Sequence, residues 1–322
     1  MCAMNLRMVV CVAALLGVTP LAFAQPALPS LIKIVVPFSP GASNDVIARA
    51  IAVQLAKRLE VAVIVENKAG AAGVVGADVV AKSSRDGSVL LLTSTTFLTA
   101  AATQSQLPYD PIAAFAPIAM VGEGPLIMAV SSSTPFKSPA DVLTAARAKP
   151  GALNYGSAGV GSVGHLATEL LDDAAKIQML HVPYKGAANA AVDLAAGRIQ
   201  VMISSYSTLA PLIVTGKIKA LAVTSKQSHP AFADLPPLSA TVPGYAIDIW
   251  VGVFAPSGTP TLVIERLNRE INEISASPEL AAILQPDGTV ATALSPEAFT
   301  SRVKEELARW KQIATEHKIV AE

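Results

Sequence analysis

Residues 33–65 read KIVVPFSPGASNDVIARAIAVQLAKRLEVAVIV. The stretch opens with a β-branched run at 33–36, passes through a loop rich in Pro, Gly and Ser, and then spaces its apolar residues helically over 46–59. A second β-branched run follows at 61–65. A strand, a helix and a strand in this order are joined by a right-handed crossover, so the stretch predicts the first unit of a parallel sheet.

The alternation of strands and helices continues along the rest of the chain. We expect a helix over 76–82 and a strand over 89–92, which predicts a parallel, doubly wound sheet. A second α/β series follows, in which Ser138 and Asp141 are spaced as a capping box. Its expected strands are 126–130, 153–155, 179–182, 201–203 and 220–223, and its expected helices are 141–148, 163–173 and 187–196. A strand over 251–255 and helices over 261–275 and 296–315 complete the pattern.

The composition indicates a large buried core and argues against two classes of partner. Hydrophobic residues make up 52% of the 322 residues and charged residues 15%, which favours a folded chain over a disordered one. The 24 basic and 24 acidic residues balance, and no run of like charge occurs. We therefore expect no nucleic acid and no anionic membrane surface as partner.

The first 24 residues are typical of a secretory signal peptide. Arg7 supplies positive charge, residues 8–16 form an apolar run, and Ala22-Phe23-Ala24 resembles a cleavage site. The apolar run is too short to span about 30 Å of hydrocarbon. We expect cleavage after Ala24 and a periplasmic protein; the alternatives are a membrane anchor or a lipid attached to Cys11. Both cysteines lie in this segment, so we expect no disulfide in the exported chain.

The loop at residues 37–45 is the first candidate for ligand binding. Gly41 can adopt a positive φ, and Ser43, Asn44 or Asp45 can cap the following helix. Free N–H groups at a helix start favour an anion. The expected ligand-binding residues are Phe38, Pro40, Gly41, Ala42, Ser43 and Asn44, with Asp45 in a structural capping role; the alternative is an ordinary strand-to-helix turn.

The loop at residues 157–165 is the second candidate. Gly159, Gly161 and Gly164 satisfy the G-x-G-x-x-G pattern of dinucleotide sites. That pattern also requires an acidic residue at the end of the next strand, where this chain has residues 181–184, HVPY. We therefore interpret the loop as a carboxylate cradle formed by Ser157, Gly159, Gly161 and Ser162, with His165 as a structural hydrogen-bonding residue.

Hydroxyl side chains after the strand at 89–92 form the third candidate. Ser94, Thr95 and Thr96 stand at the expected end of this strand. Hydroxyl groups both donate and accept hydrogen bonds, so Ser94 and Thr95 are expected ligand contacts. The alternative is that they serve only as turn or cap residues.

The sequence lacks the patterns of common catalytic centres. No G-x-S-x-G elbow occurs, and no cysteine follows the first 24 residues. The four histidines, at positions 165, 181, 229 and 317, are not spaced as zinc ligands. We expect no metal, no cofactor and no catalytic residue, hence a binding protein. The alternatives are an exported α/β enzyme and a receptor that presents its ligand to a signalling partner.

A series of motifs resembles the receptors of tripartite tricarboxylate transporters, also called Bug receptors. Residues 37–49 (PFSPGASNDVIAR) resemble the opening motif of the family and residues 66–73 (ENKAGAAG) its second signature. Further motifs follow in the family's order at 86–87, 107–110, 115–118, 157–162, 165–166, 181–186, 221–225, 250–252, 255–260 and Trp310. The resemblance covers nearly all of the chain after residue 24.

This resemblance implies a type II periplasmic-binding-protein fold, an α/β protein with a doubly wound sheet in each lobe and a ligand cleft between the lobes. We expect residues 25–127 and 251–322 in the first lobe, residues 128–250 in the second, and capture by hinge closure. It further implies a carboxylate held by the first two loops and delivery to a membrane permease of one large and one small subunit. We expect a monomer.

Departures from the family pattern bear on the ligand. Members that bind amino acids place an Asp for the ammonium group after the strand at 201–203, where this chain has Ser204 and Ser205. A buried ammonium without a partner costs several kcal/mol. We therefore expect Ser204 and Ser205 to contact a small organic acid that carries no α-amino group.

The exported protein should begin at Gln25, because Ala22 and Ala24 satisfy the small-residue rule for cleavage. Mass analysis of the N-terminus of the periplasmic protein measures this directly. A retained Cys11 that carries lipid would contradict the prediction.

Overall fold

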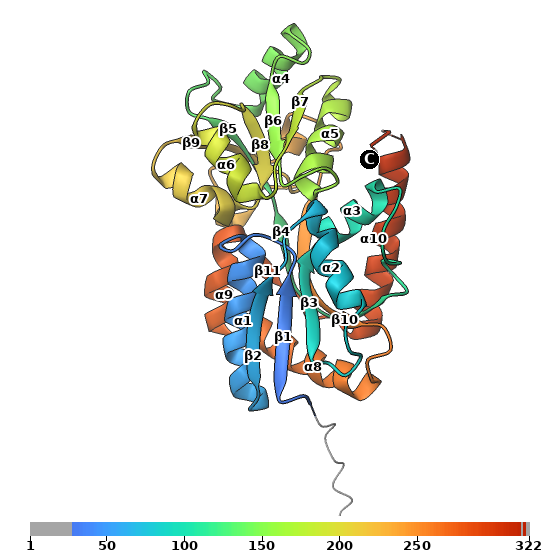
Figure 1. The fold of residues 1–322 in the computed structure, drawn as a ribbon. Helices are drawn as coiled ribbons and strands as arrows, with labels where there is room; N and C mark the ends of the chain where they lie inside the picture. Colours follow the sequence, from blue (N-terminus) through green and yellow to red (C-terminus); the bar gives the residue numbers. More distant parts are fainter. Residues whose placement is uncertain (1–27, 317, 320–322) are drawn as a thin grey trace, which may run out of the picture.

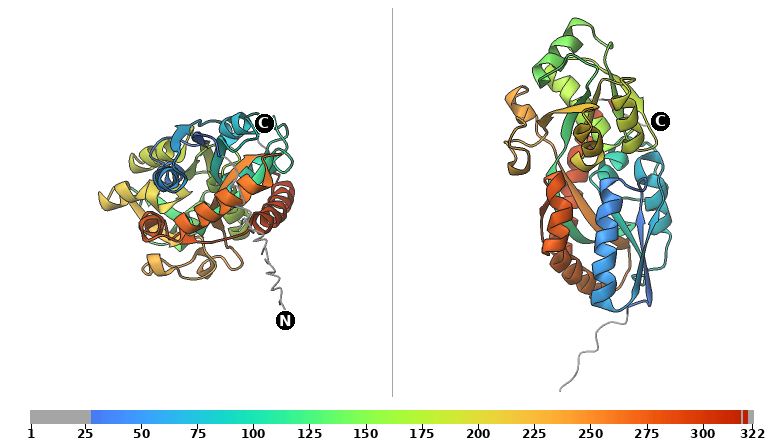
Figure 2. Two further views of the ribbon diagram at one scale, coloured as in Figure 1. Left: turned by 90° about the horizontal axis from the view of Figure 1, so that it is seen from below. Right: turned by 90° about the vertical axis from the view of Figure 1, so that its left-hand side faces the viewer.

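The computed structural model describes residues 28–316 and 318–319. The expected signal peptide with its cleavage site after Ala24, and His317, lie outside these residues. Two mixed sheets with helices on their faces form two lobes, stacked along the long axis of the molecule (Figures 1 and 2). Within the described ranges, none of the helices has both the length and the apolar character needed to cross a bilayer.

The first lobe is built on a six-stranded sheet with the order β11-β4-β10-β3-β1-β2. These strands are β1 (Leu31–Val36), β2 (Ala62–Asn67), β3 (Val89–Ser94), β4 (Phe115–Pro125), β10 (Asp248–Pro256) and β11 (Val290–Ala291). The predicted parallel arrangement is confirmed for β1, β2 and β3. Strand β10, for which the sequence predicted no direction, pairs antiparallel with β3 and β4 because the chain returns from the second lobe in the opposite direction.

Helices cover both faces of this sheet. They are α1 (Ser43–Leu59), α2 (Val74–Ala81), α3 (Thr96–Thr103), α8 (Thr261–Ser275), α9 (Pro278–Leu284) and α10 (Pro296–Glu316), with the short turns η1 (Ala71–Gly73) and η4 (Gln285–Asp287). Ile51 of α1 and Leu267 of α8 are fully buried in the core of one face. Phe97 of α3 and Trp310 of α10 lie in the core of the other face, which continues into the second lobe.

The second lobe is built on a five-stranded sheet with the order β7-β6-β8-β5-β9. Its strands are β5 (Ile127–Ser131), β6 (Asn154–Ser157), β7 (Leu180–Pro183), β8 (Val201–Ser204) and β9 (Ile218–Val223); its helices are α4 (Pro139–Ala148), α5 (Val163–Ala175), α6 (Ala187–Ala195) and α7 (Tyr206–Val214), with the turns η2 (Pro230–Phe232) and η3 (Leu238–Ala240). Strands β6, β7 and β8 are parallel. The predicted capping box is confirmed at α4, where Ser138 Oγ accepts from Asp141 N and Asp141 Oδ2 accepts from Ser138 N.

Several elements were not predicted, and each has weak local signals. Helix α3 (TFLTAAAT) contains three threonines, whose helix propensity is low. Helix α7 carries Pro211 in its interior, and β4 (FAPIAMVGEGP) contains two prolines and two glycines. Packing against the rest of the molecule therefore decides these elements.

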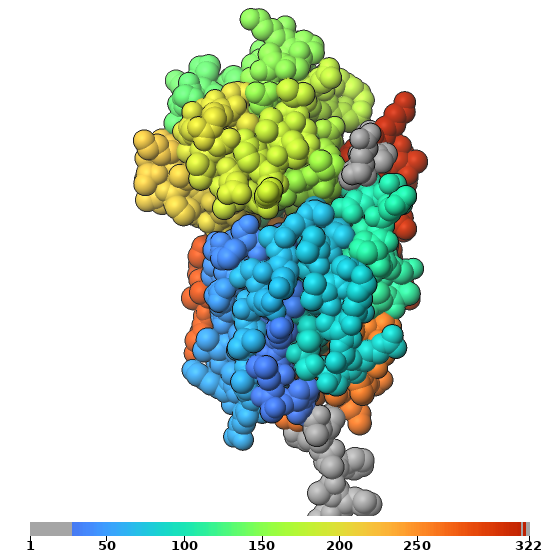
Figure 3. Space-filling model, viewed as in Figure 1, coloured from blue at the N-terminus to red at the C-terminus, as the bar shows by residue number. Residues whose placement is uncertain are grey.

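The chain crosses between the two lobes at two adjacent segments, here called the narrow crossing, and Thr224 bonds to both of them. A single residue, Leu126, lies between the end of β4 in the first sheet and the start of β5 in the second. The buried hydroxyl of Thr224 accepts from Leu126 N at 2.8 Å and donates to Ile247 O at 2.7 Å, where the chain returns toward β10. The single hydroxyl thereby links both crossing segments. Figure 3 shows the second lobe, in green to yellow, stacked directly on the first, whose visible face is mostly blue to cyan.

Candidate functional site

A cavity lies between the carboxyl edges of the two sheets. Parallel strands present their carboxyl ends at one edge, and the loops after β1, β2 and β3 face those after β6, β7 and β8 across the cavity. The lining residues are Pro37, Phe38, Ser39, Ala42, Ser43, Asn44, Gly70, Ala72, Gly73, Ser94, Thr96, Pro125, Leu126, Ala158, Ser162, Val163, Gly164, Lys185, Gly186, Ala187, Met202, Ile203, Ser204, Ser205, Thr208, Ile249, Val251, Asp287 and Thr289.

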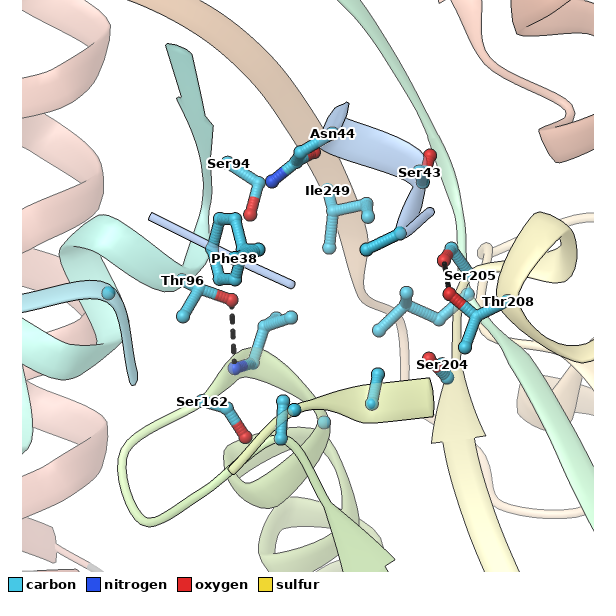
Figure 4. A pocket seen from close by; sticks show the side chains of 18 of the residues that line it. Phe38, Ser43, Asn44, Ser94, Thr96, Ser162, Ser204, Ser205, Thr208 and Ile249 are labelled. Carbon is cyan, nitrogen blue, oxygen red and sulfur yellow. Dashed lines mark hydrogen bonds between the residues drawn. The ribbon is translucent and has the colours of Figure 1, made fainter. Parts of the chain in front are cut away.

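The size of the cavity suits a small molecule. The space open to the centre of a water-sized sphere is about 100 Å³, and one water needs roughly 10–15 Å³ on this measure. Hydroxyl and amide groups gather around it, with apolar surface from Phe38 and Ile249 (Figure 4). Such a mixture of apolar surface and a few polar groups is typical of small-ligand sites.

The first loop turns at Gly41 and presents backbone N–H groups at the start of α1. Gly41 adopts the expected positive φ of 81°. Helix α1 has Ala42 as its N-cap, and no side chain caps it. The expectation that Ser43, Asn44 or Asp45 is the N-cap of this helix is therefore wrong, because all three lie within it. The Ser43 hydroxyl donates to Asp287, and the Asp45 carboxylate accepts from Gly41 N. The N–H groups of Ser43 and Asn44 have no hydrogen-bond partner in the described part of the chain and remain available to an anion.

Asp45 anchors this loop from behind. Its carboxylate accepts from Gly41 N at 2.9 Å, from Asn67 Nδ2 at 2.9 Å and from Arg49 Nε at 3.1 Å. Burial alone would raise the pKa of Asp45, but the hydrogen bonds from Arg49, Gly41 and Asn67 outweigh it and leave the pKa below its usual value. The carboxylate therefore stays charged and fixes the loop, and it does not line the cavity.

The second loop brings the start of α5 to the opposite wall. Ser162 caps α5 and accepts from His165 N at 3.4 Å. The Val163 N–H donates across the gap between the lobes to Thr96 Oγ1 at 3.3 Å, as the dashed line in Figure 4 shows. The Gly164 N–H has no partner among the residues that the structure describes. This loop therefore supplies both a contact between the lobes and a free donor.

The structure brings eight of the expected ligand-binding residues to the cavity wall and places six elsewhere. The lining residues are Phe38, Ala42, Ser43, Asn44, Ser94, Ser162, Ser204 and Ser205; Pro40, Gly41, Thr95, Ser157, Gly159 and Gly161 do not line it. Thr95 instead accepts from Trp250 N at 3.0 Å, and Ser157 Oγ lies 2.7 Å from His181 Nε2. A Cβ on Gly161 would lie 2.5 Å from Thr103 Oγ1, so this glycine allows the loop to approach α3.

Several parts of the wall were not predicted. Lining residues of the motifs at 66–73 and 181–186 had no expected ligand role, and Asp287 lies outside every motif. The loop at 70–73 has positive φ throughout, including 46° at Ala71 and 52° at Ala72. Each non-glycine residue in this region costs roughly 1–2 kcal/mol, and such strain is concentrated at functional sites.

Helix N-termini supply most of the positive potential of the cavity. Residues at or next to the starts of α1, α3, α5 and α6 line it, and each start carries a partial positive charge. The charged side chains on the wall are the buried Asp287 and Lys185, which is exposed and makes no hydrogen bond or ion pair with the described residues. This arrangement can hold an anion by backbone donors and dipoles, without a cluster of basic side chains.

A stack of aromatic rings supports the second loop from below. The His165 and His181 rings are stacked at 3.9 Å, and the Tyr155 ring lies 4.9 Å from that of His181. His165 Nδ1 accepts from Gly161 N at 3.1 Å, which gives His165 the structural role that we expected. Burial lowers the pKa of His165 to about 3, with a smaller effect of His181, and lowers that of His181 to about 4. Both imidazoles are neutral at pH 7.

The Ser157–His181 pair lies away from the cavity. Ser157 is 1% exposed and does not line the cavity wall. Among the described residues, no hydrogen bond to His181 Nδ1 orients the imidazole ring. Residues 28–316 and 318–319 likewise hold no group of His, Cys, Asp and Glu that could bind a metal.

Several known proteins are similar to this chain in sequence and in fold. The family described as "Tripartite tricarboxylate transporter family receptor" matches residues 47–319. Protein BugT of Bordetella pertussis is 33% identical over 290 residues, covering 88% of each chain. R. palustris Rpa4515, solved with adipate, has a TM-score of 0.85 at 33% identity over 90% of this chain and 98% of its own. MatC of Rhodopseudomonas palustris, solved with bound malate, has a TM-score of 0.82 at 28% identity over 88% and 98%.

The free energy of unfolding should fall as the pH drops from about 6 to about 4.5. Over this range the unfolded chain binds protons at His165 and His181 that the folded protein does not. Asp172 opposes this trend, because burial raises its pKa to about 7 and the folded protein takes up that proton first. Over this range the unfolded chain holds two protons at the two histidines, whereas the folded protein holds one at Asp172. The free energy of unfolding therefore falls by about 1.4 kcal/mol for each pH unit of acidification through these three groups.

Urea denaturation at several pH values measures how the free energy of unfolding depends on pH. The His181→Gln variant isolates the contribution of His181 to this slope. Removing one histidine should flatten the slope by about 1.4 kcal/mol per pH unit relative to the unsubstituted protein. Equal slopes for the two proteins would show that His181 titrates normally in the folded state.

Proposed function

The chain belongs to the tripartite tricarboxylate transporter receptors, the Bug-type periplasmic solute-binding proteins, and from this premise we propose that it captures a small organic acid without an α-amino group. The acid binds between the lobes, which close on it by a hinge motion. The protein, acting as a monomer in the periplasm after removal of its signal peptide, then delivers the acid to a membrane permease of one large and one small subunit.

The observation that carries this proposal is the convergence of helix starts from both lobes on one cavity. The unpartnered N–H groups of Ser43 and Asn44 come from the first lobe, and that of Gly164 comes from the second. Each helix start stabilises an anion by roughly 0.3–2 kcal/mol, and the upper end of this range applies where the site is partly buried. A carboxylate bound between them therefore draws the two lobes together.

Two further observations support the choice of ligand. Rpa4515 was solved with adipate and MatC with malate, both carboxylic acids. At the end of β8, Ser204 and Ser205 offer hydroxyl groups and no charge, and both line the cavity. The Ser205 hydroxyl lies 2.9 Å from that of Thr208, so this wall suits a neutral polar or carboxylate group better than an ammonium.

The narrow crossing supports closure by a hinge. The lobes are joined at Leu126 and at the segment before β10, and both segments are bonded to Thr224. Small changes of φ and ψ at such element ends move whole lobes. The part of the wall formed by Ile249 and Val251 lies in β10, directly after this crossing, which supports a hinge at the bottom of the cavity.

Organic acids should stabilise the protein against heat more than their amino-acid analogues do. The proposed site lacks a free carboxylate for an ammonium group, and an unpaired buried ammonium is costly. A thermal-shift panel that pairs succinate with aspartate and 2-oxoglutarate with glutamate measures the difference. A larger shift with the amino acids would mean that another residue supplies the missing charge.

A negative charge at residue 44 should weaken binding of the best acid from this panel. Asn44→Asp keeps the shape of the side chain and places a carboxylate on the wall, and like charges about 4 Å apart repel by roughly 1–4 kcal/mol. We expect calorimetry to show an affinity reduced by about 10-fold to 1000-fold. Gln227→Glu, which adds the same charge at an exposed position outside the cavity, should bind normally. Normal binding by Asn44→Asp would remove the start of α1 from the site.

A further inference from the structure

The turn η4 lies where the first lobe contacts α7 of the second lobe. It follows α9 and precedes β11, so it is part of the first lobe by connectivity. In Figure 1 the end of α9 lies next to α7 of the second lobe. The last residue of the turn, Asp287, is 5% exposed and lines the cavity.

The Asp287 carboxylate binds groups from both lobes. Asp287 Oδ2 accepts from the hydroxyl of Ser43, at the start of α1 in the first lobe, at 2.5 Å. The same oxygen accepts from the Ser207 hydroxyl of α7 in the second lobe at 2.9 Å, and Oδ1 accepts from Ser207 N. Hydrogen bonds to an ionised acceptor are about twice as strong as neutral ones, and the N-terminus of α7 adds its dipole.

The next residue shows that the turn is shaped for contact with the second lobe. Gly288 has a φ of 66°, and a Cβ at this position would lie 2.7 Å from Phe232 Cε2 and 2.9 Å from His229 Cε1. Both rings belong to the segment around η2 in the second lobe. Only glycine therefore permits this approach of the lobes, independently of the hydrogen bonds of Asp287.

We propose that Asp287 is a positioning residue for the ligand site, a clasp that holds α7 of the second lobe against the first loop when the lobes close. This inference rests on the proposed function. The clasp fixes Ser43, whose N–H is a free donor, and aligns the start of α7, where Ser205 and Thr208 line the cavity. It also occupies the N-terminus of α7 with a carboxylate of the protein, which leaves the ligand to the starts of the other helices.

Opening of the lobes separates Asp287 from Ser207 but leaves Asp287 and Ser43 in one lobe. The clasp therefore contributes to the closed state alone, and its loss should speed ligand release. The hydrogen bonds on the other side of the cavity, from Val163 N to Thr96 Oγ1 at 3.3 Å and from Thr99 Oγ1 to Gly161 O at 2.8 Å, join neutral groups. The two sides of the closed cleft are thus held unequally, and the charged side has the larger effect on closure.

Fluorescence energy transfer between the lobes tests the clasp without any ligand. The exported chain is expected to lack cysteine, so Lys217→Cys and Glu279→Cys, both at exposed positions, place one dye on each lobe. In this background Asp287→Asn, Ser207→Ala and the matched surface control Asp234→Asn are compared. We expect a smaller closed population with Asp287→Asn, a lesser decrease with Ser207→Ala because its N–H remains, and no change with Asp234→Asn.

Ligand kinetics on the same variants complete the test. With the best acid of the thermal-shift panel, Asp287→Asn should release ligand about tenfold faster and bind it with little change in the association rate. Urea midpoints of the unliganded proteins identify a variant that merely fails to fold, in which case Ser207→Ala decides the result. An unchanged closed population in both variants overturns the clasp. Failure of every acid to bind overturns the proposed function and leaves the energy-transfer result to judge the clasp separately.

Discussion

Two sheets meet at the carboxyl edges of their parallel strands, and the rest of the site depends on that constraint. Because loops leave a parallel strand at its carboxyl end and lead into a helix start, each sheet presents helix N-termini at the same edge. The starts of α1 and α3 therefore face those of α5 and α6. The antiparallel strand β10 carries the chain back from the second lobe at this edge and adds Ile249 and Val251 to the wall.

This geometry explains how a chain without a basic cluster can hold an anion. Lys185 is the single cation on the described wall, and it is exposed, so solvent weakens its attraction. Backbone donors in a partly closed cavity have a fixed orientation and cost little reorganisation when the ligand arrives. Such donors also leave no unpaired buried charge when the cavity is empty, whereas a buried Arg would need a permanent partner.

The protein uses its own carboxylates and rings to keep these donors in place. Asp45 fixes the first loop through Gly41, and His165 fixes the second through Gly161. Both groups lie behind the cavity wall, so they shape the loops without competing for the ligand. Asp287 differs because it lies on the wall and bonds to both lobes, which couples the position of the first loop to closure.

Local spacing by itself determined β1, β2 and β3, most of the helices and the capping box at Ser138, since each depends on neighbours within a few residues. It also indicated Phe38, in the loop before α1, and Asn44, in the first turn of α1, which both reach the cavity. Only the tertiary structure decided the antiparallel insertion of β10, the burial of Ser157 against His181 and the role of Asp287. Ser43 and Asp287 are 244 residues apart, and their contact arises from the packing of η4 between the lobes, which no short pattern encodes.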